Sequence, residues 1–115
     1  MDTAVIVTWK VPFPGREKQA LDFAAESDEY WGKLAGEGKC SAPEWYFLPE
    51  GWGIWMVKGE RRMLEGIIAE EETSKLLARG LLLMDGWQYR LADTGSGAER
   101  FMGHYAAVGG QLGLI

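Results

Sequence analysis

The sequence of 115 residues predicts an antiparallel α+β fold that pairs with a second copy of itself. Two observations predict it. Segments with strand and helix patterns follow one another in the order β, α, β, β, α, β, α. In addition, three of the four predicted strands are apolar on both faces. A sheet with one face in water would instead alternate apolar and polar residues along each strand.

Length and composition limit the possibilities before any motif is considered. A chain of this length with 47% hydrophobic residues suits a single domain over residues 1–115. Its net charge of -5 and sequence pI near 4.9 argue against nucleic acid and membrane surfaces as partners. Cys40 is the only cysteine, which favours a reducing compartment. The short apolar run at Met1–Lys10 has no signal-peptide pattern, so we expect a cytoplasmic protein.

The first half of the chain predicts a strand, a helix and a hairpin. Ala4–Lys10 is rich in β-branched residues and ends before Pro12. Glu44–Leu48 and Trp52–Lys58 flank turn residues and predict a β-hairpin. Between them a helix follows Gly15, with apolar residues at helical spacing: Ala20, Phe23, Ala24, Tyr30, Trp31 and Leu34.

The second half predicts a broken helix and a last strand. Helical spacing returns at Glu60, and Thr73 or Ser74 is the expected cap of a second helical piece. Asp85–Gly86 is typical of a turn, and Trp87–Ala92 alternates as a half-exposed strand does.

A third helix is predicted at the end of the chain. Ser96 followed by Glu99 matches a capping box. Phe101, Tyr105 and Val108 form one apolar stripe, and Gly109–Gly110 is expected to end the helix.

The order βαββαβ predicts the ferredoxin-like arrangement, a four-stranded antiparallel sheet with helices on one face, here followed by a C-terminal helix. The opposite sheet face is then open, yet its residues are apolar. They include Ala4, Ile6, Tyr46, Leu48, Trp52, Ile54 and Met56. Either the C-terminal helix or a second subunit must cover them, and we favour a homodimer formed through this face. The simpler alternative is that all these side chains belong to a monomer core.

The stretch Val11-Pro-Phe-Pro-Gly-Arg-Glu-Lys-Gln-Ala-Leu21, within this element order, is similar to a segment of uncharacterised bacterial proteins of the dimeric α/β-barrel superfamily. The resemblance covers roughly residues 4–92. It implies architecture rather than chemistry, because that superfamily includes cofactor-free oxygenases, haem-dependent enzymes, isomerases and proteins without known activity.

Several side chains are candidates for a ligand site between sheet and helices. Arg90 could hold an anionic group, or it could be an edge residue of the sheet. Aromatic side chains could bind an apolar or aromatic small molecule, although packing explains them equally well. The predicted ligand-binding set is Tyr30, Trp31, Trp55, Tyr89, Arg90 and His104.

Other reactive groups carry weaker predictions. His104 is the only histidine, and a surface or interface role is more common for such a residue than haem ligation. Glu71 or Glu72 could turn inward as a general base, but charge runs usually face solvent. Nucleophilic catalysis by Cys40 is improbable without a sequence partner. We expect no metal and no cofactor.

Two functions follow from these observations. The first is a small homodimeric protein that binds an apolar or aromatic metabolite. The alternative is a cofactor-independent oxygenase or isomerase acting on an aromatic or polyketide-like substrate. A pure assembly module is a third class.

Overall fold

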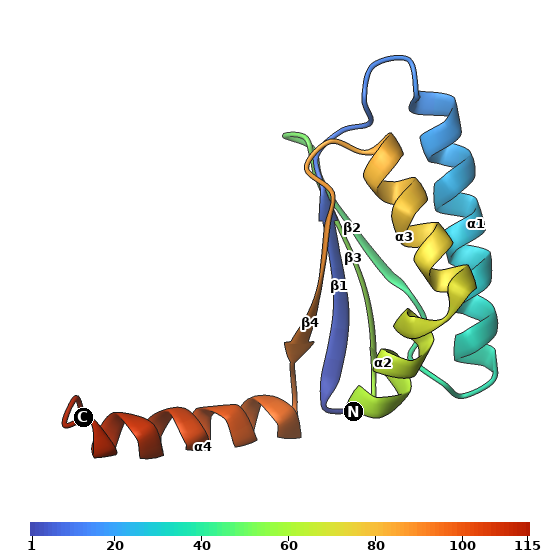
Figure 1. The fold of residues 1–115 in the computed structure, drawn as a ribbon. Helices are drawn as coiled ribbons and strands as arrows, with labels where there is room; N and C mark the ends of the chain where they lie inside the picture. The colour runs from blue at the N-terminus through green and yellow to red at the C-terminus, as the bar shows by residue number, and fades with distance from the viewer.

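The computed structural model describes all residues 1–115 as one sheet with three helices on one side and a fourth helix projecting from the other (Figure 1). Its elements are β1 (Thr3–Trp9), α1 (Glu17–Gly36), β2 (Glu44–Leu48), β3 (Trp52–Gly59), α2 (Arg61–Ala69), α3 (Glu71–Leu83), β4 (Gln88–Asp93) and α4 (Ser96–Gln111). The predicted α+β class and element order are confirmed. None of the helices is both long and apolar enough to cross a membrane.

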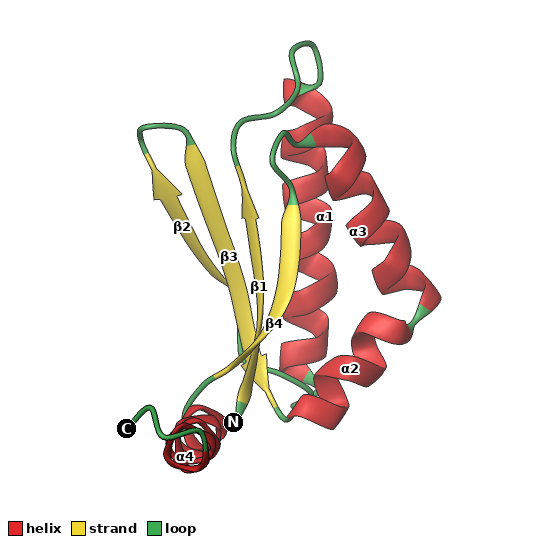
Figure 2. Cartoon of the chain, turned by 60° about the vertical axis from the view of Figure 1, so that its left-hand side comes forward, coloured by secondary structure: helices red, strands yellow, loops and turns green.

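The four strands form an antiparallel sheet in the order β2-β3-β1-β4. This is the ferredoxin-like arrangement that the element order predicts. Each crossover passes through the helical layer, which lies against a single face of the sheet (Figure 2). β1 and β3 are central, and they supply the most deeply buried strand residues, among them Val5 and Val57.

The core lies between this face and the helices. In β1, Val5 and Val7 point toward the helices, as Trp55 does in β3, and all three are buried. From the other side, α1 contributes one stripe of buried residues at helical spacing: Ala20, Phe23, Ser27, Trp31 and Leu34. Helix α2 adds Leu64, which is fully buried. The predicted apolar face of the first helix is therefore confirmed, with Ser27 as an unexpected member.

The predicted break in the second helical segment is confirmed and lies between α2 and α3, but the predicted caps are wrong. Glu70 is the residue between the two helices, with extended backbone at φ -71° and ψ 146°. Thr73 is already inside α3 and fully buried. Its hydroxyl lies 2.6 Å from the phenol oxygen of Tyr30. The hydroxyl that could have capped a helix therefore forms a hydrogen bond with α1 instead.

Helix α4 begins at Ser96 as predicted, but neither of its ends follows the predicted chemistry. Gly95 occupies the N-cap position at φ +53°, and no side-chain cap hydrogen bond forms. The helix also continues through Gly109 and Gly110. It ends at Gln111, and Gly113, whose φ is +73°, follows the cap residue Leu112. The Leu114 N–H donates to the carbonyl oxygen of Gly109 at 2.9 Å. This pair of features is a Schellman motif, in which Gly113 takes the left-handed position just after the helix.

The sheet face away from the helices has the composition that the sequence predicts. The register places Ile6, Met56 and Ile54 at the centre of this face, with the exposed side chain of Tyr46 beside them. Polar side chains surround this apolar centre, namely Glu44, Lys58, Gln88 and Arg90. Helix α4 does not cover them, because it contacts the body only near β4 and then projects away from the sheet (Figure 1). We refer to this surface as the open sheet face.

Candidate functional site

A cavity of about 470 Å³ lies between the sheet and the helices. Nineteen of its 24 lining residues are hydrophobic. They include all six tryptophans of the chain, which are Trp9, Trp31, Trp45, Trp52, Trp55 and Trp87. Space of this size in an apolar setting is typical of sites for small molecules.

Strand alternation and one glycine place the tryptophans together. Trp45 of β2 is the register partner of Trp55 of β3, so both indoles project toward the helices. Trp9 ends β1 opposite Gly53. A Cβ atom at Gly53 would lie 2.3 Å from the Trp9 ring, so only glycine lets this indole lie across β3.

We call the aromatic lining of this cavity the wall. Most of its ring pairs meet edge to face, an arrangement that aromatic quadrupoles favour, and Trp45 and Phe47 are stacked instead. Trp31 and Trp55 have ring centroids 5.1 Å apart, with 63° between their planes. Trp9 and Trp45 are 6.0 Å apart at 77°. Phe23 holds Trp87 in the same way, with centroids 5.7 Å apart. These contacts give the wall a defined shape.

Few polar groups reach the cavity. Lys10, Glu17 and Ser27 are the only lining residues with polar side chains besides the indoles. The Trp45 indole N–H donates to Asp28 at 2.9 Å. The Trp55 indole nitrogen has no hydrogen-bond partner, and it is the one buried side-chain nitrogen or oxygen atom of which this is true. An unpaired buried donor costs about 1–3 kcal/mol relative to a paired one.

The mouth of the cavity is also apolar. It lies between the β2–β3 hairpin, the start of α1 and the loop after β1. Exposed lining residues here are Val11, Leu21, Phe47, Leu48 and Trp52. The Lys10 ammonium lies 5.2 Å from the centre of the Trp52 ring, so a cation–π contact holds the one basic lining residue at the protein surface.

Two of the six predicted ligand-binding residues line this cavity, namely Trp31 and Trp55. Tyr30 packs against Trp31 with centroids 5.8 Å apart, and its hydroxyl is engaged by Thr73. Tyr30 therefore supports the wall from behind. Ligand contact by Trp31 and Trp55 stays a prediction.

The other three candidates lie elsewhere. Tyr89 and Arg90 border a shallow surface hollow beside α3. Arg90 is the register partner of Ile6, which places it on the open sheet face, and its guanidinium donates to Gln88. His104 lies on α4, away from the sheet. The structure therefore does not bring Arg90 or His104 to the cavity.

The remaining reactive groups are also outside it. Glu71 and Glu72 are exposed and form ion pairs with Lys75 at 3.2 and 4.0 Å, so neither turns inward as a base. Burial raises the pKa of the Cys40 thiol, which lowers its reactivity. No group of three or more histidine, cysteine or carboxylate side chains could hold a metal ion.

Sequence reasoning missed Trp9, Trp52 and Trp87 as members of the wall. A signal was present in the composition, since six tryptophans in 115 residues is a large number for packing alone. Their convergence depends on the sheet register and on Gly53, which periodicity does not reveal.

Comparison with solved structures finds the same fold in proteins of distant sequence. One is a protein of unknown function from Nitrosomonas europaea, NE2512, at 17% identity and a TM-score of 0.56, covering 81% of this chain and 88% of that one. Another is a candidate antibiotic biosynthesis monooxygenase from Chloroflexus aurantiacus, at 11% identity and 0.56, covering 83% and 94%.

A candidate antibiotic biosynthesis monooxygenase from Bacteriodes thetaiotaomicron has a TM-score of 0.58 at 15% identity, covering 82% of this chain and 89% of that one. No family model and no curated protein matches the chain. The predicted resemblance to dimeric α/β-barrel proteins is therefore confirmed at the level of the fold.

Proposed function

We propose that this protein binds a planar, apolar small molecule in the tryptophan-lined cavity. The observation that carries the proposal is the convergence of all six tryptophans on one cavity of about 470 Å³. Indole rings offer large, rigid contact surfaces to flat ligands, and edge-to-face packing among them keeps those surfaces in place.

The polarity of the wall selects an uncharged ligand. An ion placed in this cavity would lose its hydration without gaining a buried partner of opposite charge, because Lys10 and Glu17 lie at the surface.

Intrinsic fluorescence tests this function directly, because every tryptophan is a reporter. A panel of uncharged aromatic compounds is titrated into the purified protein, with matched carboxylate derivatives in parallel. We expect saturable quenching by uncharged members and at least a tenfold weaker response to the charged ones. A response that is absent, or equal for both sets, contradicts the proposal.

Two variants of α1 provide the control. Ala24 lines the cavity, whereas its neighbour Ala25 is exposed and does not. Ala24→Phe should fill part of the cavity and weaken binding at least tenfold, and Ala25→Phe should leave the affinity unchanged. Equal effects of the two substitutions would show that the ligand binds elsewhere.

The proposal includes a homodimer formed through the open sheet face. An aromatic and aliphatic surface of this kind is typical of an interface rather than of a solvated sheet. A C2 pair would bury the same surface on both copies. A cytoplasmic location belongs to the same proposal, supported by a lone, buried and unpaired cysteine.

Oxygenation is the second candidate function, favoured by the fold shared with two candidate monooxygenases. A water-poor aromatic cavity suits a substrate that supplies its own reactivity toward oxygen. Oxygen uptake, measured with the compounds that quench fluorescence and without any added cofactor, separates this function from simple binding. Tight quenching without oxygen uptake or product leaves binding as the function.

A further inference from the structure

Helix α4 is an arm without a partner in its own chain. Its contacts with the body are limited to the neighbourhood of β4. One face carries Phe101, Tyr105, Val108 and Leu112 at spacings of four, three and four residues, and all four side chains are about half exposed or more. This spacing makes a continuous stripe along a helix, which we call the arm stripe.

The composition of the arm is unsuited to a helix in water. Four of its 16 residues are glycine, and each costs about 1 kcal/mol relative to alanine in a helix interior. An isolated helix of this length is marginal even with a favourable sequence. Residues 105–115 contain no charged side chain. A helix of this kind requires tertiary packing, and its own chain does not supply it.

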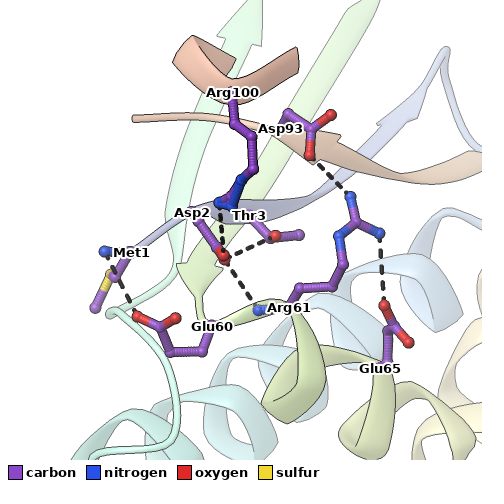
Figure 3. A network of polar contacts seen from close by, with 8 residues as sticks. All are labelled: Met1, Asp2, Thr3, Glu60, Arg61, Glu65, Asp93 and Arg100. Carbon is purple, nitrogen blue, oxygen red and sulfur yellow. Dashed lines mark hydrogen bonds and ion pairs between the residues drawn. The ribbon is translucent and has the colours of Figure 1, made fainter. Parts of the chain in front are cut away.

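The root of the arm is anchored to the start of the chain. Asp2 forms an ion pair with Arg100 at 3.6 Å and accepts hydrogen bonds from the Thr3 hydroxyl and the Arg61 backbone N–H, both at 3.0 Å (Figure 3). Gly97 packs against the Asp2 backbone, where a Cβ would lie 2.2 Å from the carbonyl oxygen. The arm therefore leaves the body at a defined angle.

That angle carries α4 out on the side of the open sheet face, away from α1 and α3 (Figure 1). Sixteen residues of helix extend about 24 Å, and two stacked sheets lie about 10 Å apart. An arm of this length passes beyond the sheet of any copy that stacks on the open face. The arm and the open sheet face thus border the same volume.

The dimensions of the chain agree with a missing partner. A protein of 12.8 kDa usually exposes about 6,300 Å² and has a radius of gyration of about 13 Å. This chain exposes 7440 Å² and has a radius of gyration of 16.5 Å. The excess of roughly 1,100 Å² is comparable to the surface that one partner contributes to a stable interface, about 800 Å².

We propose that α4 of each protomer packs through the arm stripe against the body of a second copy of this chain, so that the two copies exchange arms. This inference rests on the proposed homodimer and adds a second contact region to it. A membrane surface does not fit the stripe, because such helices carry many basic residues on the polar face and α4 has only Arg100.

Two variants on opposite sides of α4 test the arm. Tyr105→Glu places a carboxylate on the arm stripe, whereas Ala107→Glu places it two residues further, about 200° around the helix. Sedimentation equilibrium is measured across concentrations, and near-UV circular dichroism of the tryptophans verifies the body fold. We expect Tyr105→Glu to raise the dimer dissociation constant at least tenfold and Ala107→Glu to change it less than threefold. Equal constants for the two variants overturn the proposal.

A photocrosslinker then identifies what the arm contacts. A benzophenone side chain placed at position 105 of the full chain should yield, after irradiation, a covalent species of twice the chain mass. Crosslinks found only within one chain overturn the exchange of arms. Ligand quenching is recorded on the same samples, because loss of the arm contact should leave the cavity intact. An unchanged dimer dissociation constant in Tyr105→Glu would show that the arm does not contribute to the dimer, and would leave the open sheet face as its interface.

Discussion

At the residue scale, the cavity depends on two glycines that make room for indole rings. Gly53 lies under Trp9, and Gly80 of α3 lies under Trp87. A Cβ atom at Gly80 would be 2.3 Å from the Trp87 ring. The absence of a side chain at these two positions therefore shapes the cavity, because it allows each indole ring to lie close to the backbone.

Gly80→Ala and Gly32→Ala are predicted to change stability in opposite directions. Both glycines lie inside helices, where alanine is favoured by up to about 1 kcal/mol. Nothing lies within 4 Å of a Cβ at Gly32, so Gly32→Ala should raise the free energy of unfolding. Gly80→Ala should lower it by about 1–3 kcal/mol, because the new methyl group displaces Trp87. Chemical denaturation measures both, and a stabilised Gly80→Ala would contradict the packing described for Trp87.

At the scale of elements, α4 is attached to the body by charge rather than by an apolar face. Four interactions favour the ionised form of Asp2: the hydrogen bond from the Thr3 hydroxyl first, then the Arg61 backbone N–H, the charge of Arg100 and the backbone N–H of Asp2 itself. They hold the pKa of Asp2 below its ordinary value of 3.8. A second ionic contact, between Arg61 and Asp93 at 3.0 Å, braces the end of β4 beside the same root (Figure 3).

The stabilisation from Asp2 should be lost in acid. A group whose pKa is lowered by folding stabilises the folded state fully above its unfolded pKa. The contribution then declines as the pH falls below 3.8 and through the lower folded value. Thermal unfolding of the wild type and of Asp2→Asn should therefore differ at pH 6 and converge in strong acid. A difference that is independent of pH would show that the ionised carboxylate contributes nothing.

At the scale of the whole molecule, the helical layer covers only one face of the sheet (Figure 2). The helices α1, α2 and α3 cover one side of β1 and β3, whereas Ile6, Ile54 and Met56 lie on the other side and are half-buried. Burial of such a surface yields about 25 cal/mol per Å². A second copy is the cover that we propose.

Ile54→Lys is predicted to separate the two copies. The substitution places a charge in the centre of the proposed interface, and we expect at least a hundredfold rise in the dimer dissociation constant. Leu82→Lys is the matched control, because Leu82 is exposed on α3 in the helical layer. Light scattering after gel filtration reads the mass of each variant. A wild type that is monomeric at all concentrations would refute the dimer, and the cavity would then be tested alone by fluorescence.

Local sequence patterns predicted the elements well where turn residues or the spacing of apolar residues indicate one structure. The β2–β3 hairpin follows from its turn residues and aromatic strands, and α1 follows from apolar residues at helical spacing. They failed where a polar group had two possible partners. Thr73 bonds Tyr30 instead of capping α3, and Ser96 forms no cap because Gly95 takes that position. Such choices depend on neighbours that are distant in the sequence.

The sequence alone predicts that this protein has four antiparallel strands, that its crossover helices lie on one face of the sheet, and that the centre of the opposite face is apolar. Period and composition suffice for those features, because they report which side of each element avoids water. The meeting of six tryptophans in one cavity, and the departure of α4 from its own sheet, become visible only in the folded chain. Both outcomes depend on register and on close approach at glycines, which no local pattern contains.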